Sequence, residues 1–514
     1  MFRCLLFTTF LLSMLSFTEA DQPDLKLDKI ADRKPKNVIF ILSDDHRYDV
    51  MSFLDHPWVK TPEMDKMAKD GVYFKNAMVT TSLCSPSRAS ILTGLYMHNH
   101  GVVDNNVPTP DGTIFFPQYL QKAGYNTGYF GKWHMGGHSD APRPGFDRWV
   151  SFRGQGHYYP PVKPKNWALN IDGKSVKQKG YITDELTDYC LDWLTQQKAD
   201  GKPFFAYLSH KGVHGDFFPA KRHAGEYLGE EMPIPSTMAN TEANYKTKPL
   251  WLKNQRNSWH GVDFSYHKDV PVDDHYRRYC ETLLAVDESI GRVRNWLADN
   301  NLDEDTVVFY MGDNGFQWGE HGLIDKRTAY EASIRVPLLG VCPGEWKPGT
   351  TLDSVVANID IAPTILEAAG LNKPDHMDGD SFFQLAAGKG NPDSWRQYLM
   401  YEYYWEYSFP QTPTTFALRG SRYKFIQYHG IWDIDELYDL QEDPEEKHNL
   451  IFDPKQASRI KEMRYQLHQI LEQSQANRVP FSHKRTMGQN LRLKKGSKPA
   501  DFPPELMREK NRDE

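Results

Sequence analysis

Four short runs rich in apolar and aromatic residues recur along the chain, and each of them ends in polar side chains. They cover residues 38–42, 125–130, 204–208 and 307–311. A run of about five such residues is typical of a strand that is buried on both faces of a parallel sheet. The carboxyl ends of parallel strands meet at one edge of the sheet, where α/β proteins place their functional sites. The polar clusters are therefore the first candidates for chemistry.

Helical periodicity fills the intervals between these runs. It predicts helices over residues 62–70, 88–96, 116–123, 182–197 and 274–300. Alternation of buried strands and helices is typical of an α/β fold, with a large and mostly parallel sheet sandwiched by helices. The segment 160–270 is rich in Pro, Lys and His, and we interpret part of it as insertions over the functional face.

The pattern changes after a turn-like stretch at residues 388–393. Alternating strand signals follow, and then a helical pattern, which together predict a smaller α+β subdomain with an antiparallel sheet. The predicted strands cover residues 398–407, 415–419, 423–428 and 436–439, and the helix covers 456–473. We expect a signal peptide at 1–20, an N-terminal extension at 21–36, a catalytic domain at 37–390, the C-terminal subdomain at 391–480 and a polar, basic tail at 481–514.

Composition and charge exclude some classes of function. The net charge of −7 over 514 residues argues against general nucleic-acid binding, which favours basic proteins. Arg3, the apolar run 4–17 and the small residues around Ala20 predict a secretory signal peptide, with a signal anchor as the alternative. No other apolar stretch reaches membrane length, so we expect a secreted or periplasmic protein without an integral membrane segment.

The cysteines do not form a disulfide framework. Cys84, Cys190, Cys280 and Cys342 are widely spaced, and only one bridge among them is open as a possibility. Cys84 differs from the others because Ser85, Pro86 and Ser87 follow it as helix-starting residues, with Arg88 four positions later. A helix start beside a guanidinium is a site for a tetrahedral oxyanion such as sulfate or phosphate.

Three other interpretations of Cys84 are weaker. A buried structural cysteine is the usual default. A cysteine-dependent phosphatase loop has five residues between Cys and Arg, whereas this chain has three. A zinc thiolate is disfavoured because the sequence contains no Cys-x-x-Cys pair.

Residues 84–94, Cys-Ser-Pro-Ser-Arg-Ala-Ser-Ile-Leu-Thr-Gly, resemble the signature of the formylglycine-dependent (type I) sulfatases of the alkaline-phosphatase-like superfamily. The resemblance runs from about residue 37 to residue 449, through matches at 43–45, 131–134, 210–214, 312–315 and 325–327. It implies the alkaline-phosphatase-like fold and hydrolysis of sulfate esters. It also implies that Cys84 is converted to Cα-formylglycine, by a formylglycine-generating enzyme or an anaerobic sulfatase-maturating enzyme.

Hard oxygen ligands stand at the ends of two predicted strands. Asp44 and Asp45 follow the first strand, and Asp313 and Asn314 follow the last one. Three crowded carboxylates repel one another unless a cation is present, and an all-oxygen set suits calcium better than zinc. Turn residues or helix caps are the alternative interpretation. The resemblance implies one calcium ion at these four positions, with the modified residue 84 as a further ligand.

The remaining polar positions receive roles from the resemblance. Arg88 stabilises the hydrated aldehyde, and Lys132 contacts the nucleophile and the sulfate. After the hydrate attacks sulfur, His214 and Lys326 assist departure of the alcohol, and His134 is the base that releases sulfate and regenerates the aldehyde. Lys132 and His134 alternate on a segment expected to be extended, so both are predicted to face the site while Trp133 packs inward. His210 is interpreted as structural, since the spacing of His210 and His214 lacks the Glu of a zinc motif.

The substrate is predicted less specifically. Residues 324–331, 335–338 and 145–159 resemble the N-acetylglucosamine-6-sulfatases, which implies a 6-O-sulfated glucosamine unit of a glycosaminoglycan or mucin-type glycan. A sulfatase for another sulfated sugar or for an aryl or alkyl sulfate is the first alternative. A non-catalytic protein that binds sulfated glycans is the alternative from another class. The aromatic residues at 401–409 are interpreted as strand core rather than as a sugar platform.

Overall fold

A ten-stranded sheet forms the centre of the computed structural model, which describes residues 25–162, 167–258, 260–264, 270–406, 409–429 and 433–477. The predicted signal peptide and the basic tail lie outside the described residues. The strand order is β11-β2-β10-β9-β1-β8-β4-β5-β6-β7. The five strands β9, β1, β8, β4 and β5 pair in parallel, while β10, β6 and β7 run antiparallel to neighbours. The prediction of a mixed, mostly parallel sheet is confirmed.

The strands of this sheet are short. They are β1 Asn37–Ser43, β2 Val72–Phe74, β4 Asn126–Lys132, β5 Arg148–Phe152, β6 Leu169–Ile171, β7 Lys174–Val176, β8 Phe204–Ser209, β9 Thr306–Gly312, β10 Leu338–Val341 and β11 Thr350–Leu352. A separate two-stranded sheet joins β3 Ala77–Met78 to β12 Val356–Ala357.

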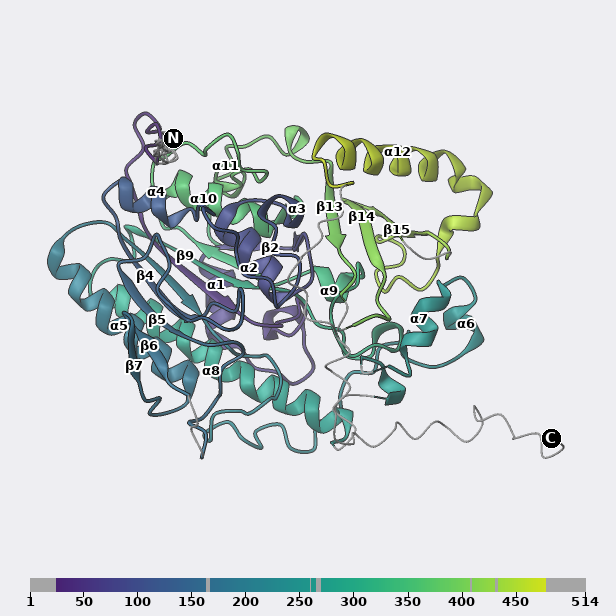
Figure 1. Cartoon of the computed structure of the whole chain (residues 1–514), viewed down its shortest axis with the longest axis horizontal. Coiled ribbons are helices and arrows are strands. Elements are labelled where there is room, and N and C mark those ends of the chain that lie inside the picture. The colour runs from purple at the N-terminus through teal and green to yellow at the C-terminus, as the bar shows by residue number, and fades with distance from the viewer. Residues whose placement is uncertain are drawn as a thin grey trace, which may run out of the picture.

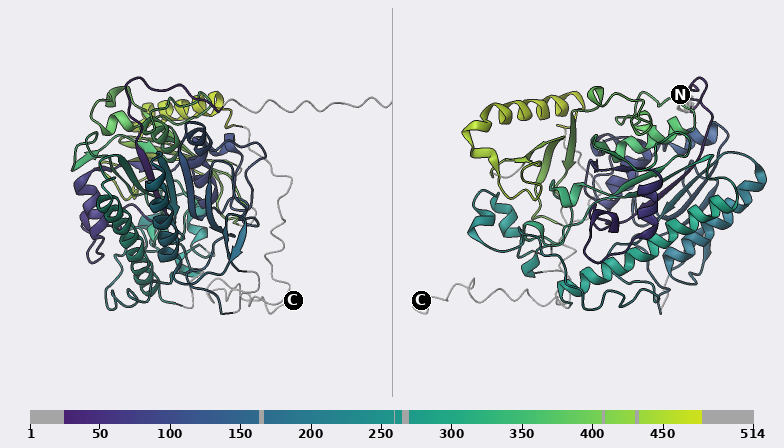
Figure 2. Two further views of the ribbon diagram at one scale, coloured as in Figure 1. Left: turned by 90° about the vertical axis from the view of Figure 1, so that its left-hand side faces the viewer. Right: turned by 180° about the vertical axis from the view of Figure 1, so that it is seen from behind.

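Helices cover both faces of the large sheet (Figures 1 and 2). One face packs against α1 Pro62–Asp70, α5 Ile182–Asp200 and α8 Val272–Asp299. The other face packs against α2 Cys84–Thr93, α4 Pro117–Lys122, α10 Ile361–Ala368 and α11 Phe383–Ala386. The shorter helices are α3 Met97–His100, α6 Glu242–Tyr245, α7 Leu250–Gln255 and α9 Glu331–Ile334.

Strand β1 shows why the apolar runs of the sequence do not alternate with polar residues. Ile39 and Ile41 point to the core that contains α5 and α8, whereas Val38, Phe40 and Leu42 point to the core that contains α2 and α10. All five side chains are fully buried. Because successive side chains of a strand point to opposite faces, a strand between two helical layers must be apolar on both.

A four-stranded antiparallel sheet forms the C-terminal region, as predicted. It consists of β13 Tyr398–Tyr403, β14 Thr414–Gly420, β15 Tyr423–His429 and β16 Glu436–Asp439, in that order. Helix α12 Ala457–Gln473 packs on one face, at the upper right of Figure 1. The other face carries Tyr401, Ala417 and Ile426 and packs against the loop and helix around Tyr330. The predicted aromatic strand is therefore core, since Tyr401, Tyr403 and Tyr404 are buried.

Two local expectations differ from the structure. The helix expected from residue 88 begins at Cys84, so the cysteine and the arginine share one helix from its first turn. The loop-rich segment 160–270 also contains the hairpin β6–β7, whose strands of three residues are too short to give a periodic signal. Cys190, Cys280 and Cys342 are buried free thiols, so the structure contains no bridge between them.

Candidate active site

The carboxyl ends of four neighbouring strands, β9, β1, β8 and β4, build the site. Strand β1 ends at Ser43 and its parallel neighbour β9 ends at Gly312, and these two residues are paired in register. Asp44 and Asp313, the next residue of each chain segment, therefore emerge side by side. Strand β8 ends at Ser209 on the other side of β1. The polar residues that follow these strands therefore lie at one edge of the sheet.

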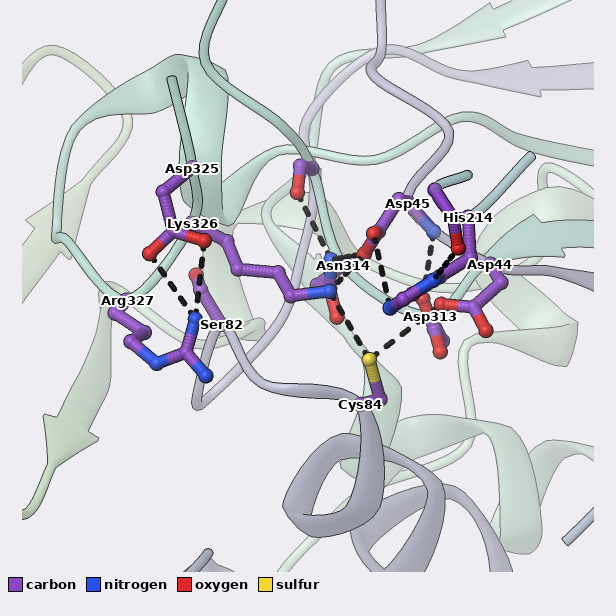
Figure 3. A network of polar contacts seen from close by, with 12 residues as sticks. Asp44, Asp45, Ser82, Cys84, His214, Asp313, Asn314, Asp325, Lys326 and Arg327 are labelled. Atoms are coloured by element: carbon purple, nitrogen blue, oxygen red, sulfur yellow. Dashed lines mark hydrogen bonds and ion pairs between the residues drawn. The ribbon is translucent and has the colours of Figure 1, made fainter. Parts of the chain in front are cut away.

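The acidic residues converge as the sequence predicts. Asp44, Asp45 and Asp313 each offer a carboxylate oxygen within 4.8 Å of the others, and all three are buried. Asn314 donates to Asp45 Oδ1 at 2.6 Å, and the backbone N–H of Asp45 donates to Asp313 Oδ1 at 3.0 Å. Figure 3 shows these residues together with Cys84 and Lys326.

Cys84 is the first residue of α2 and points into this cluster (Figure 3). Its Sγ lies 3.4 Å from Asp44 Oδ1 and 3.1 Å from Lys326 Nζ. The thiol is fully buried. Burial, together with the charge of Asp44, raises the pKa of the Cys84 thiol to about 12. An unmodified Cys84 is therefore a neutral thiol at neutral pH, which is a poor nucleophile.

Arg88 lies one helical turn after Cys84 and connects three strand ends. Its Nε donates to Asp313 Oδ2 at 2.8 Å, and one terminal nitrogen donates to Lys132 O at 2.7 Å and to Ser209 Oγ at 2.6 Å. The other terminal nitrogen lies 3.5 Å from Asp44 Oδ2. The guanidinium thus fixes the relative positions of α2, β4, β8 and β9 around the site.

Lys132 and His134 both face the site, although not for the predicted reason. Lys132 ends β4 and donates to Asp44. His134 has a φ of 65°, so its backbone is left-handed rather than extended. This conformation is uncommon outside glycine and is found at functional sites. Trp133 packs inward against Tyr129 and Trp149, as expected.

His214 and Lys326 approach from two different loops. Lys326 Nζ donates to Asp45, and His214 Nε2 lies 3.8 Å from Asp45 Oδ2. His214 Nδ1 lies 2.6 Å from the carbonyl oxygen of Gly215. A carbonyl only accepts, so Nδ1 carries the proton and Nε2 is the atom left for proton exchange. His210 instead contacts Ser289 within the core, in agreement with a structural role.

Cationic side chains balance the negative charge of the clustered carboxylates. Three carboxylates, Asp44, Asp45 and Asp313, face three cationic side chains, Arg88, Lys132 and Lys326, so their formal charges cancel. Mutual repulsion alone therefore does not require a metal ion. Burial raises the pKa of Asp44, but Lys132, His214 and Arg88 together hold it well below its usual range. Burial and the neighbouring Asp44 raise the pKa of Asp313 to about 7.

The donor set nevertheless fits a hard cation. The side-chain oxygen of Asn314 is buried and has no hydrogen-bond partner among the described residues. A buried amide oxygen without a partner costs free energy, and a cation beside it removes that cost. With the three clustered carboxylates it completes an oxygen-rich site of the type that calcium prefers.

Two polar residues at the site were not assigned roles from the sequence. Gln155 contacts both Lys132 and His134, and Ser209 accepts from Arg88. Ser209 directly follows a predicted strand, so the rule that points to Asp44 points to it as well. Gln155 follows β5, which was not predicted as a strand because two of its five residues, Arg148 and Ser151, are polar.

Comparison with known proteins identifies the family. A family model described as "Sulfatase" matches residues 36–371, and a model described as "N-sulphoglucosamine sulphohydrolase, C-terminal" matches residues 319–473. The chain belongs to the sulfatase family. It is therefore a sulfuric ester hydrolase, and the predicted family and enzyme class are confirmed.

Individual sulfatases match over most of the chain. An N-acetylglucosamine-6-O-sulfatase of Bacteroides thetaiotaomicron is 32% identical over 497 residues, covering 86% of each protein. An N-acetylglucosamine-6-sulfatase of Capra hircus is 33% identical and covers 83% of this chain and 80% of its own. A structure solved with its substrate D-glucosamine-2-N,6-O-disulfate superposes with a TM-score of 0.78 at 30% identity, over 86% of this chain and 99% of that one. This sulfatase thus resembles N-acetylglucosamine sulfatases in sequence, and the protein solved with the glucosamine disulfate in fold, over most of the chain.

Within the described ranges, none of the helices combines the length and the apolar character needed to cross a bilayer.

Proposed function

We propose that this sulfatase hydrolyses the 6-O-sulfate ester of N-acetylglucosamine in a glycosaminoglycan or mucin-type glycan, through residue 84 in its formylglycine form and one calcium ion. The observation that carries the proposal is the position of Cys84 Sγ, 3.4 Å from Asp44 Oδ1 and 3.1 Å from Lys326 Nζ. Residue 84 stands at the start of a helix beside cationic side chains, and both features favour binding of a sulfate group next to it.

Calcium would be held by Asp44, Asp45, Asp313 and Asn314 and would supply Lewis-acid charge to a sulfate oxygen. Formylglycine at residue 84 would supply the hydroxyl nucleophile that a neutral, buried thiol does not. Maturation therefore requires a formylglycine-generating enzyme or an anaerobic sulfatase-maturating enzyme as a partner.

The cationic residues stabilise charge in the proposed reaction. Burial lowers the pKa of Lys326, but the carboxylates of Asp45 and Asp44 hold it well above its usual value. Lys326 is therefore a permanent cation for the departing alcohol oxygen. Burial lowers the pKa of Arg88, but the neighbouring carboxylates of Asp313 and Asp44 raise it above its usual value. Arg88 and Lys132 would together place positive charge around the sulfate group of the substrate.

The two histidines are suited to proton transfer. Burial, with Lys132 as the next contribution, lowers the pKa of both His134 and His214 well below the usual histidine value. Both imidazoles are therefore neutral and able to accept protons. We assign the release of sulfate to His134 as base. Nε2 of His214 would take the proton of the attacking hydroxyl and pass it to the departing alcohol oxygen, which leaves the imidazole neutral again.

Domain limits and location are part of the proposal. The catalytic domain would cover residues 37–390 and the C-terminal subdomain 391–480. Secretion or export to the periplasm would follow removal of residues 1–20, which amino-terminal sequencing of the exported protein tests.

The substrate is tested with protein matured by co-expression with a formylglycine-generating enzyme. Sulfate release is measured from N-acetylglucosamine-6-sulfate, N-acetylglucosamine-3-sulfate, N-acetylgalactosamine-6-sulfate and 4-nitrophenyl sulfate. We expect kcat/KM for the first compound to exceed the others by at least about tenfold, which corresponds to about 1.4 kcal/mol of transition-state discrimination. Equal or faster hydrolysis of another compound would reject the proposed substrate. Binding of a sulfated glycan without sulfate release would favour the non-catalytic alternative.

A further inference from the structure

Gln155 lies between two side chains of the proposed site. It follows β5, whose last residue, Phe152, is paired with Lys132 at the end of β4. Gly156 turns the chain here with a φ of 68°, and a Cβ at this position would lie 2.4 Å from the Phe152 ring. Only glycine fits such a close approach with a left-handed backbone. The turn therefore holds the Gln155 side chain over the end of β4.

The contacts of Gln155 define the orientation of its amide. Lys132 Nζ lies 2.5 Å from Gln155 Oε1. An ammonium group only donates, so the amide oxygen must face Lys132 and the amide nitrogen must face the other way. That nitrogen lies 3.0 Å from His134 Nε2.

This orientation also determines the protonation of His134. Because the Gln155 amide nitrogen only donates, His134 Nε2 must accept and carries no proton. The proton of the neutral ring is then on Nδ1, which lies 3.2 Å from Ser85 Oγ. Ser85 Oγ can accept it and donate its own hydrogen to the carbonyl oxygen of His134, also at 3.2 Å. Every donor in this chain of contacts meets an acceptor.

We propose that Gln155 is a positioning residue that sets the tautomer of His134, so that the proton lies on Nδ1 while Nε2 is unprotonated and accepts from the Gln155 amide, and that couples this ring to Lys132. The inference rests on the proposed function for the role of His134 as the base. The tautomer itself is a property of the resting protein and does not depend on which sulfate ester is hydrolysed.

Gln155→Glu is the decisive variant because it keeps the shape of the side chain and removes its donor. A carboxylate only accepts, so His134 Nε2 must then donate, and the accepting atom of the neutral ring moves from Nε2 to Nδ1. Gln427→Glu is the matched control. Gln427 Oε1 lies 3.1 Å from His468 Nε2, a second Gln–His contact far from the site between β15 and α12.

Two readouts separate positioning from a general effect on structure. Nitrogen-15 spectra of histidine-labelled protein report which ring nitrogen is protonated, with the His134→Gln variant providing the assignment. We expect Nδ1–H in the natural protein and Nε2–H in Gln155→Glu. In the matured enzyme, kcat should fall by about 10²-fold or more, the usual contribution of a positioned base, while KM changes less than about threefold. Gln427→Glu should change neither readout at His134.

Failure of the inference about Gln155 can be told apart from failure of the proposed function. Nε2–H in the natural protein, an unchanged tautomer in Gln155→Glu, or a kcat within about threefold of the natural enzyme would overturn the inference. Failure of the natural, matured enzyme to release sulfate from any of the sulfated sugars would instead overturn the proposed function, and the nitrogen-15 spectra would still decide the tautomer.

Discussion

Arg327 joins the loop that carries Lys326 to the C-terminal subdomain, and its replacement should damage both stability and activity. Its Nε donates to Glu406 Oε1 at 2.8 Å, and one terminal nitrogen donates to both carboxylate oxygens of Asp325 at 3.0 Å. The guanidinium lies 3.9 Å above the ring of Phe409. All three charged side chains are at most 5% exposed. Arg327→Met would therefore leave two buried carboxylates without their shared cation.

The expected loss follows from these contacts. Removing one partner of a buried ion pair costs about 3–5 kcal/mol. Tyr403 still donates to Glu406 at 2.8 Å, and His260 Nδ1 lies 3.1 Å from Asp325, so we expect the lower end, about 3 kcal/mol. Lys326 lies between Asp325 and Arg327 in the sequence, so loss of their ion pair should displace the Lys326 side chain in the site. A small displacement of a catalytic group lowers kcat/KM by about 10²-fold, and we expect a loss of this size.

Equilibrium urea unfolding followed by tryptophan fluorescence measures the change in the free energy of unfolding. The matched control is the triple variant Asp325→Asn, Arg327→Met, Glu406→Gln, which removes all three charges. It should recover at least half of the lost stability, because neutral replacements leave no buried charge unpaired. A loss below about 1 kcal/mol in Arg327→Met, with kcat/KM unchanged, would refute this reasoning.

Three further predictions concern single residues. Burial lowers the pKa of His210 to about 3, so between this value and the unfolded pKa of 6.5 the unfolded state binds more protons and stability falls as pH falls. His210→Gln should therefore reduce the loss of unfolding free energy between pH 7 and pH 4.5 by about 2.5 kcal/mol, and an equal loss in both proteins would contradict this. Calcium at about 100 times its Kd should stabilise the natural protein by about 2.7 kcal/mol in thermal unfolding, and Asn314→Leu should lose most of this shift, whereas an identical shift would reject Asn314 as a ligand. Cys84→Ala should show no measurable sulfate release with an unchanged unfolding midpoint, and substantial release would reject residue 84 as the nucleophile.

The sequence predicts the strands of the site well because they are buried on both faces. Residues 38–42 and 307–311 lack polar positions, and the register that pairs Ser43 with Gly312 brings their terminal acids together. Helix α3 has four residues and strand β6 has three, and elements this short give no periodic signal. Their positions depend on contacts with distant segments rather than on local pattern.

Side-chain detail at the site follows from the three-dimensional arrangement. The left-handed backbone of His134 is not visible in a segment that reads as extended, yet it determines how the ring faces the site. Gln155 is 23 positions from Lys132 in sequence and meets it only because β4 and β5 are adjacent. Likewise, the balance of three carboxylates by three cations depends on loops that the pattern of apolar residues does not place.

The mass of the tryptic peptide spanning residues 76–88 tests the central claim most directly. Protein made together with a formylglycine-generating enzyme should yield this peptide with a mass about 18 Da below that of the cysteine form, because a thiol has been replaced by an aldehyde. The same preparation should release sulfate from a sulfated sugar. An unmodified Cys84 in a preparation that hydrolyses sulfate esters at full rate would contradict the account.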